Sequence, residues 1–509
     1  MINRDGACIS LWQQHAIKFS GKQNAGQTSF DVAIAGGGIT GITTALLLQK
    51  AGKRCIVFEA YNLCFGTTGG STAHLNTLLD SPYTTLIKNF GKENAALVAR
   101  ATEQAIELVK QHINEYKIDC GFKDAAAYLF AENDEQVKEL ESIHNACREV
   151  NLKAVYAKDL PLNISSKKTM KVEGQAKLNP VQYVHALAHA FEDAGGIIMQ
   201  KCRVESVEDN GEVEIKTSKG NFRSSFFIYA THIPTGINLL HLRCSPYRSY
   251  AMAVTLKNKE YPADLYYDMY DPYHYIRSQE INGQEYLIAG AEDHKTGHVE
   301  NTGECFDKLE QYVRKHFDIE TIANKWSSQY FEPADALPYI GELPGHSEKI
   351  LVATGYGGNG ITYSHVAAVT LRDIILNKPN PYIPLFNPNR IKPVAGFVSF
   401  LSHNADVVKQ FASRFFAHEQ LDKISDLKQG EGKVIKYDGE LIALYKDEKG
   451  LLHAIHPVCT HMKCEVKFNN AEKSWDCPCH GARYNVDGDV ITAPSSQNLE
   501  DVNIKMHNA

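Results

Sequence analysis

The sequence predicts two folded parts: a large Rossmann-like α/β domain that also carries an antiparallel sheet, and a small all-β domain behind it. Two observations predict this division. A glycine-rich strand–helix–strand pattern stands near the start of the chain, and four of the twelve cysteines crowd into residues 459–479. The other eight cysteines show no paired spacing, which is typical of reduced thiols. With 509 residues, the chain is long enough to form more than one domain.

Composition and charge exclude several classes of protein. The net charge of −7 gives no basic surface for nucleic acid, so no nucleic-acid partner is expected. No apolar run reaches the roughly 18 residues of a membrane helix. The first residues lack the basic and apolar regions of a secretory signal, so we expect a cytoplasmic location.

The glycine-rich unit lies in residues 31–60. An apolar strand precedes Gly36, Gly38 and Gly41, a helix follows them, and a second apolar strand ends at Glu59. The glycines have the G-x-G-x-x-G spacing that allows a tight turn, close approach of a pyrophosphate and close packing of helix on strand. The helix N-terminus would face the phosphates, and Glu59 would hold the ribose hydroxyls. The spacing predicts a dinucleotide site but does not distinguish FAD from NAD.

Residues 30–378 resemble the FAD-dependent amine and amino-acid oxidoreductases, which include glycine oxidase, D-amino-acid oxidase and the sarcosine and dimethylglycine dehydrogenases. The resemblance is carried by residues 66–75, 178–196, 226–234, 335–344 and 350–364. It implies an FAD-binding fold with a substrate subdomain at about 80–170 and 240–330. No second complete glycine-rich unit is present for a nicotinamide cofactor. The FAD contacts that the resemblance implies are Gly36, Gly38, Ile39, Thr40, Gly41, Glu59, Ala60, Thr67, Thr68, Ser71, Thr72, Ala73, Val204, Ala230, Thr231, Gly358, Asn359, Gly360, Ile361 and Thr362.

The chain departs from this family at two positions. Family members that act on amino acids place an arginine where this chain has Glu332, and a carboxylate there would repel a substrate carboxylate. A cationic or neutral amine is therefore the expected substrate. The histidine that carries covalent FAD in the dimethylglycine dehydrogenase branch corresponds to Gly70, so we expect non-covalent FAD.

The candidate catalytic residues are inferred only from their positions in the sequence. Residues 245–254 and 266–298 are expected to form a sheet facing the substrate, with Tyr273, Tyr275 and Arg277 alternating onto one face. An aromatic-rich sheet that packs only on its own domain is an equally good interpretation. A mononuclear iron site at Asp293, His294 and His298 is disfavoured, because these residues are expected in a turn. The candidates for orienting substrate are His74, Tyr267, Tyr275 and Arg277.

A boundary is predicted after residue 378. Residues 379–393 are rich in proline and asparagine, which favours extended chain. An amphipathic helix follows, with apolar positions at Phe397, Leu401, Val408, Phe411 and Phe415. We interpret it as a linker helix packed on a domain; contact with a membrane surface is the less favoured interpretation. The predicted domains are an extension at 1–29, an oxidoreductase domain at 30–378, a linker at 379–420 and a last domain at 421–509.

The last domain contains the most specific motif in the chain. Cys459 and His461 stand in one segment and Cys477 and His480 in another, with 15 residues between the two pairs. Two thiolates on one iron and two imidazoles on the other are the ligands of a Rieske 2Fe–2S cluster. A structural zinc site uses the same residue types and is the alternative.

About the last 80 residues resemble the Rieske proteins of respiratory and photosynthetic cytochrome complexes, which favours the cluster over zinc. The resemblance implies a disulfide between Cys464 and Cys479. It places Ala482 where proteins of highest potential have a serine, and Tyr484 where a tyrosine bonds a cysteine ligand. We therefore expect a potential below that of the respiratory proteins.

Together the two parts predict a dehydrogenase that oxidises an amine-type C–N bond and passes electrons from FAD through the cluster to an external one-electron acceptor. The histidine face of the cluster is the expected exit. The alternatives are an electron-transfer component of an oxygenase system and a non-catalytic redox sensor. The whole chain resembles bacterial fusions of a glycine-oxidase-like domain with a Rieske domain.

Overall fold

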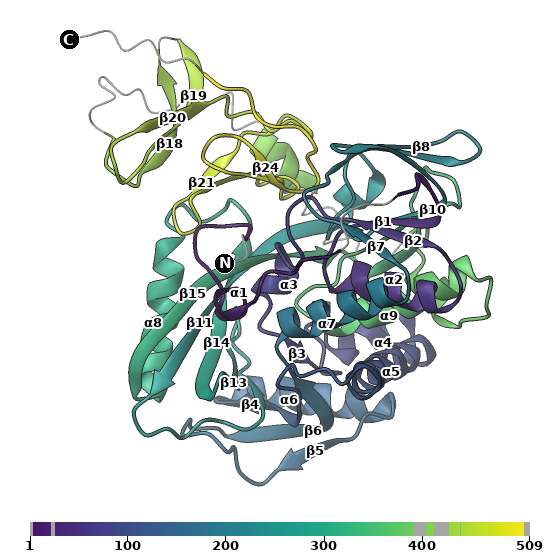
Figure 1. Ribbon diagram of the computed structural model, residues 1–509. Coiled ribbons are helices and arrows are strands. Elements are labelled where there is room, and N and C mark those ends of the chain that lie inside the picture. The colour runs from purple at the N-terminus through teal and green to yellow at the C-terminus, as the bar shows by residue number, and fades with distance from the viewer. Residues whose placement is uncertain (1–3, 22–25, 391–403, 412–426, 438, 503–509) are drawn as a thin grey trace.

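The computed structural model describes residues 4–21, 26–390, 404–411, 427–437 and 439–502. The larger part contains a mainly parallel sheet and a mainly antiparallel sheet (Figure 1). The strands after residue 430 form a smaller unit seated on one side of it, yellow-green in Figure 1. This architecture confirms the predicted fold class.

The first sheet has the order β16-β17-β10-β1-β2-β7, and β1, β2, β7, β10 and β17 run parallel. Two of its strands, Cys55–Phe58 and Ile350–Thr354, are apolar and buried nearly or wholly throughout, as is typical of strands covered on both faces. The strands of this sheet are β1 (Ser29–Ala35), β2 (Cys55–Phe58), β7 (Ile197–Met199), β10 (Gly220–Tyr229), β16 (Tyr339–Glu342) and β17 (Ile350–Thr354), with the hairpin β8 (Val204–Asp209) and β9 (Val213–Thr217) attached to β10.

Helix α2 (Ile39–Lys50) follows the glycine turn and packs against α7 and α9. Helix α7 (Pro180–Asp193) begins at Pro180, and Asn179 caps it by accepting hydrogen bonds from the N–H groups of Val181 and Gln182. The other helices are α1 (Leu11–His15), α3 (Thr67–Gly70), α4 (Tyr83–Phe90), α5 (Lys92–Tyr116), α6 (Asp134–Glu149), η1 (Leu239–Leu242), α8 (Gly303–His316), α9 (Gly360–Ile375) and α10 (Tyr382–Phe386).

The second sheet has the order β15-β11-β14-β13-β12-β4-β6-β3 and is antiparallel except where β4 lies parallel to β12. Its strands are β3 (His74–Leu75), β4 (Lys123–Ala131), β5 (Ala154–Ala157), β6 (Lys168–Lys177), β11 (Cys244–Leu256), β12 (Leu265–Tyr267), β13 (Tyr275–Ile281), β14 (Gln284–Lys295) and β15 (Ile319–Pro333).

Two local predictions for this sheet were wrong. Strand β13 begins at Tyr275, so Tyr273 precedes the strand instead of sharing its alternation. Asp293 and His294 lie in β14 and not in a turn, because pairing with β11 continues as far as Lys295, opposite Tyr247. His298 alone follows the strand.

The small unit contains two antiparallel sheets, β18-β19-β20 and β21-β22-β23-β24. The strands are β18 (Gly432–Tyr437), β19 (Glu440–Lys446), β20 (Leu452–Ile455), β21 (Lys467–Asn469), β22 (Ser474–Asp476), β23 (Arg483–Tyr484) and β24 (Val490–Thr492). One cysteine–histidine segment connects β20 to β21, and the other connects β22 to β23. The sheet strands therefore bring the two segments together.

The bridge between the parts is only partly described. The expected extended chain contains the short helix α10, which Pro381 precedes. Residues 404–411 are helical, and Val408 is 67% exposed. Phe397, Leu401 and Phe415 of the predicted amphipathic helix lie outside the described residues. Across the described residues, no helix combines the length and the apolar character needed to cross a bilayer.

Candidate functional site

The glycine turn after β1 is packed so closely that a side chain at these positions would collide with neighbouring atoms. The glycines therefore leave space for a cofactor to approach the backbone. A Cβ on Gly36, where φ is +112°, would lie 2.3 Å from the carbonyl oxygen of Ala230. A Cβ on Gly41 would lie 2.0 Å from the Gly36 carbonyl oxygen, so the third glycine packs α2 against the turn. At Gly38 the nearest atom to a Cβ would be Thr68 Oγ1, which accepts a hydrogen bond from the Ile39 N–H at 3.1 Å. These positions fit the pyrophosphate of a dinucleotide.

Glu59 lies at the end of β2 beside this turn. Its carboxylate accepts hydrogen bonds from the N–H groups of Gly37 at 2.7 Å and Tyr61 at 2.9 Å. Burial raises the pKa of Glu59, while these N–H groups and Arg203 oppose the shift. The side chain lines the cavity where ribose hydroxyls would bind.

One cavity runs from the glycine turn to the second sheet. All but three of the predicted cofactor residues line it. Gly41 packs inside, and Thr362 Oγ1 donates to the Asn76 carbonyl at 3.0 Å. Ala73 is fully buried. The small unit supplies part of the wall, through residues that the sequence did not suggest: Ile491, Thr492, Ala493, Ser495 and Ser496.

Asp80 marks the acidic end of the cavity. Its Oδ2 accepts a hydrogen bond from the Gly358 N–H at 2.6 Å, and its Oδ1 accepts one from the Tyr273 hydroxyl at 3.1 Å. Desolvation by the surrounding protein raises the pKa of this carboxyl group, although the residue is exposed along the cavity. Asp80 thereby joins the segment at Gly358 to the tyrosines of the second sheet.

A second carboxylate, Asp293, lines the same end. Its Oδ2 accepts a hydrogen bond from the Tyr330 hydroxyl at 2.9 Å, while Oδ1 is shielded from solvent and has no hydrogen-bond partner among the described residues. Burial raises the pKa of Asp293 to about 7. Glu332 lies two residues beyond Tyr330 on β15, and burial together with Asp80 and Asp293 raises its pKa to about 7. A cation entering here would stabilise the ionised carboxylates.

His74 and Tyr267 both line the cavity and contact one another. The Tyr267 hydroxyl accepts a hydrogen bond from Asn76 Nδ2 at 2.9 Å and is hydrogen-bonded to His74 Nδ1 at 2.6 Å. Burial, with nearby Arg277 and Lys177, lowers the pKa of His74 well below its usual value, so the ring is neutral.

Tyr275 and Arg277 occupy different surroundings. The Tyr275 hydroxyl lies in the cavity, 2.9 Å from Ser249 Oγ. Arg277 is fully buried and does not line the cavity. It donates to the backbone carbonyls of Thr72 at 2.9 Å, Ala73 at 2.7 Å and Leu178 at 3.2 Å, and burial lowers its pKa to about 9. Arg277 thus anchors the backbone of the cofactor loop, which we define as residues 67–73, on the side away from the cavity.

The four predicted cluster ligands converge in the small unit. The two cysteines, Cys459 and Cys477, are fully buried; His461 is 9% and His480 1% exposed. The two imidazole rings have centroids 5.1 Å apart. His461 Nδ1 is buried and has no hydrogen-bond partner among the described residues. A buried ring nitrogen with its lone pair uncommitted fits an iron ligand.

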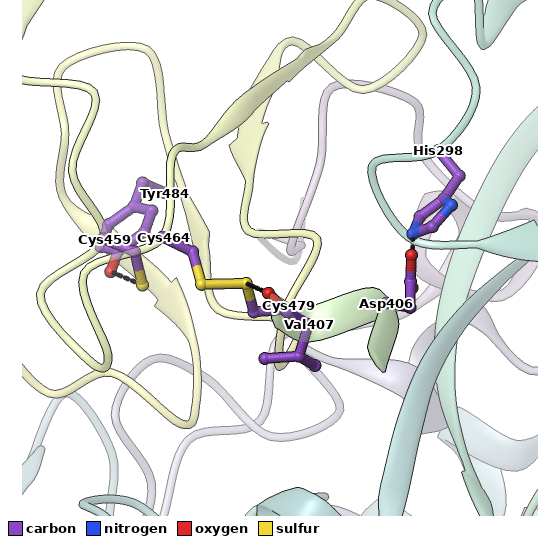
Figure 2. The surroundings of a disulfide bond; sticks show 7 residues. All are labelled: His298, Asp406, Val407, Cys459, Cys464, Cys479 and Tyr484. Atoms are coloured by element: carbon purple, nitrogen blue, oxygen red, sulfur yellow. Dashed lines mark hydrogen bonds and ion pairs between the residues drawn. A yellow bond between two sulfur atoms is a disulfide. The ribbon is translucent and has the colours of Figure 1, made fainter. Parts of the chain in front are cut away.

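The predicted disulfide between Cys464 and Cys479 joins the two ligand segments (Figure 2). The sulfur of neighbouring Cys477 lies within 4.8 Å of both, but disulfide sulfurs are not thiolate ligands. The Tyr484 hydroxyl lies 3.2 Å from Cys459 Sγ, as the resemblance implied. Ala482 is buried and offers no hydroxyl.

The N-terminal extension links the two units through buried ion pairs. Arg4 lies 3.3 Å from Glu472, and Asp5 lies 3.2 Å from Arg483. Arg248 of β11 lies 3.5 Å from Asp476 of the small unit. All of these side chains are 3% exposed or less.

The fold and the two sites define a flavoprotein oxidoreductase that carries an iron–sulfur domain. Residues 31–374 match the family described as "FAD dependent oxidoreductase", and residues 419–503 match the "Rieske [2Fe-2S] domain". The chain belongs to the FAD dependent oxidoreductase family and ends in a Rieske domain. It is an oxidoreductase whose cofactors are FAD and a 2Fe–2S cluster.

Relatives cover both parts of the chain. A protein of Bacillus subtilis (strain 168) named "Putative Rieske 2Fe-2S iron-sulfur protein YhfW" is 34% identical over 94% of each chain. The gamma-glutamylputrescine oxidoreductase of Escherichia coli (strain K12) is 21% identical over 68% of this chain and 83% of its own. The structure of glycine oxidase from Geobacillus kaustophilus matches with a TM-score of 0.59 at 18% identity, over 72% of this chain and all of that one.

Sequence reasoning missed several residues of the site. Asp80 and Tyr330 carried no motif, and Asp293 was considered only as an iron ligand. The sequence signal available for Asp293 was its position near the end of a predicted strand that contains Ala and Gly residues. The wall at 491–496 had none, because it depends on how two domains dock.

Proposed function

We propose that the protein is a dehydrogenase of a cationic amine, and that electrons pass from FAD through the Rieske cluster to an external one-electron acceptor. The supporting observation is the acidic end of the FAD cavity. Asp80 and Asp293 line it, and Glu332 lies beside them. A cytoplasmic location and the domain boundaries predicted above are part of this proposal.

The side chains at this end suit an ammonium or secondary amine. Asp293 Oδ1 is shielded from solvent and has an uncommitted lone pair, which an N–H of a bound cation could satisfy. Tyr267, Tyr273, Tyr275 and Tyr330 surround the space and exclude water from apolar parts of a substrate. An amino-acid carboxylate would meet two carboxylates instead of a guanidinium.

FAD supplies two-electron oxidation of a C–N bond, and a Rieske cluster supplies one-electron transfer. The chain's own contribution is positional. His74 lines the cavity and is held neutral by burial, and its hydrogen bond to Tyr267, which Asn76 also contacts, fixes its ring. Asp80 fixes the segment at Gly358. The gamma-glutamylputrescine oxidoreductase relative, whose named substrate is an amine, agrees with this class of substrate.

The test is anaerobic EPR of the purified protein mixed with a panel of amines. The panel contains secondary amines, N-methylated amines, diamines and, for comparison, small amino acids. We expect one cationic amine to bleach the flavin absorbance and then produce a Rieske EPR signal. A signal obtained with amino acids alone would overturn the substrate class.

Two further outcomes separate the alternatives. Flavin bleaching without any cluster signal would mean that the cluster does not receive the electrons, contrary to the proposal. No bleaching with any amine, but a normal signal after dithionite, would favour a redox sensor or a component that receives electrons elsewhere.

A further inference from the structure

One ring nitrogen of a cluster ligand points into the FAD domain. His461 Nε2 lies 3.1 Å from His241 Nδ1 and 3.2 Å from the Gly236 carbonyl oxygen. The two rings meet edge to face with centroids 4.5 Å apart. Both His241 and Gly236 follow β10, the strand whose end lines the cofactor cavity.

The donor and acceptor in this contact follow from the neighbouring groups. His241 Nε2 lies 3.0 Å from the Pro234 carbonyl oxygen, which can only accept, so this nitrogen carries a proton. His241 Nδ1 faces the Asn238 N–H at 3.4 Å, which can only donate, so Nδ1 carries the lone pair and accepts. His461 Nε2 must therefore donate. The Gly236 carbonyl, also an acceptor, requires the same assignment.

This assignment has a direct consequence for the cluster. A neutral imidazole with its proton on Nε2 has a free lone pair on Nδ1. That atom of His461 is buried without a hydrogen-bond partner among the described residues. The tautomer set by the FAD domain is thus the one that a metal ligand requires, and a partner on the outer nitrogen also orients the ring.

The surrounding interface keeps this contact in place. Gln329 of β15 donates from Nε2 to the Gly481 carbonyl at 2.8 Å, next to His480. A Cβ on Gly481 would lie 2.7 Å from Pro246, so the ligand segment packs directly on β11. Thr67 of the cofactor loop donates to the Gln329 carbonyl at 2.9 Å. Gln329 therefore contacts both the cofactor loop, at Thr67, and the cluster segment, at Gly481.

We propose that the FAD domain completes the environment of the Rieske cluster, with His241 and the Gly236 carbonyl as positioning groups for ligand His461. The histidine face of the cluster is then an internal junction with the FAD domain. This replaces the expectation that electrons leave through that face, which the FAD domain covers here. The external acceptor meets the cluster domain elsewhere.

The experiment compares His241→Leu, which removes the acceptor, with His241→Asn, whose side-chain oxygen can replace Nδ1. His453→Leu is the matched control. His453 belongs to the cluster domain, but it pairs with Asp487, outside the ligand segments. The readouts are the reduction potential from an EPR-monitored titration with dithionite, the EPR g-values, and the nitrogen couplings from pulsed EPR. No amine is used, so failure of the proposed substrate leaves this test intact.

A hydrogen-bond acceptor at Nε2 makes His461 a stronger electron donor to the iron and so stabilises the oxidised cluster. Loss of the His241 acceptor should therefore favour the reduced cluster. We expect His241→Leu to shift the oxidised-to-reduced equilibrium about fivefold toward the reduced form, as for one lost hydrogen bond. That corresponds to a rise of about 40 mV for one electron. His241→Asn and His453→Leu should stay near the native potential and keep the native nitrogen couplings.

Equal potentials and couplings in His241→Leu and His453→Leu would overturn the proposal. If His241→Leu does not retain iron, His241→Asn decides. A native potential and native couplings in that variant support positioning by hydrogen bond. Altered couplings there, with full iron content, would also overturn the proposal.

Discussion

The carboxylate of Asp5 lies 3.2 Å from the guanidinium of Arg483, although 478 positions separate the two residues in the chain. Both side chains are almost completely buried, at 3% and 0% exposure. Arg483 also contacts Asp476 at 3.0 Å, so the N-terminal extension takes part in a charge network inside the Rieske domain. A segment that lies outside both matched family regions therefore connects the two domains.

Asp5→Ala should destabilise the chain strongly. Removing one partner leaves Arg483 with less compensation for its buried charge, which costs about 3 kcal/mol. Urea unfolding at pH 7 measures this loss. Asp31→Ala is the control, since Asp31 pairs with the exposed Arg54, and it should change stability by less than about 1 kcal/mol. Equal effects of the two substitutions would contradict the assignment.

The same pair predicts a pH dependence. Burial alone would raise the pKa of Asp5, but Arg4 and Arg483 outweigh it and lower the pKa below its usual 3.8. A lowered pKa contributes stability that is present above the unfolded pKa and is lost as pH falls through the folded one. The difference between native chain and Asp5→Ala should therefore shrink only below about pH 4.

Asp293→Asn should weaken binding of an amine cation about tenfold at pH 8, as expected for a lost charge-assisted contact. Because burial raises the pKa of Asp293 to about 7, its charged form accumulates as pH rises through that value. Binding by the native protein should strengthen over this range, and Asp293→Asn should weaken the trend, leaving the part that Glu332 contributes. Flavin absorbance titrations at pH 6, 7 and 8 measure it. Asp318→Asn, an exposed position, should keep the native profile.

Arg277→Met tests whether this arginine holds the cofactor loop or orients substrate. Loss of its donors leaves three buried carbonyls unsatisfied and should cost about 3 kcal/mol of stability. The ratio of bound flavin to protein should fall, while the KM of the flavin-loaded fraction stays unchanged. Arg223→Met, at a 62% exposed position, should match the native chain. Full flavin content with a raised KM would instead indicate a substrate role.

Replacing both Cys464 and Cys479 by serine should destabilise the Rieske domain. The bond closes a loop with a sequence separation of 15, for which loop entropy predicts about 3 kcal/mol. Unfolding followed by loss of the Rieske EPR signal, recorded after reduction with dithionite, reports on this domain alone. A thiol reductant should move the native curve toward that of the variant. No response to either change would show that the bond contributes nothing to stability.

Local spacing carried most of what the sequence could predict. The turn at Gly36, Gly38 and Gly41 and the pairs Cys459–His461 and Cys477–His480 are defined within short segments, where steric and ligand requirements fix the residue types. Asp293 and Tyr330 lie on two strands that both pair with β11, and Asp80 lies in the loop between β3 and α4, so only the tertiary fold brings the three together. Arg277 shows the opposite case: it was a candidate for orienting substrate, but it is buried against backbone carbonyls and does not line the cavity.

His241 illustrates the same limit between domains. Nothing in residues 239–242 distinguishes it from a core histidine, because its partner His461 lies 220 positions away. Contacts across a docking surface depend on the shapes of both domains, and a single sequence gives no periodic signal for them.

Residues 491–496 form a wall of the same cavity whose other walls come from β1, α3 and β10. Until the last domain has folded and docked, that wall does not exist, and a newly made chain would hold its flavin in an open trough. A change that undocks the iron–sulfur domain should therefore also weaken retention of FAD, because it removes the wall at residues 491–496.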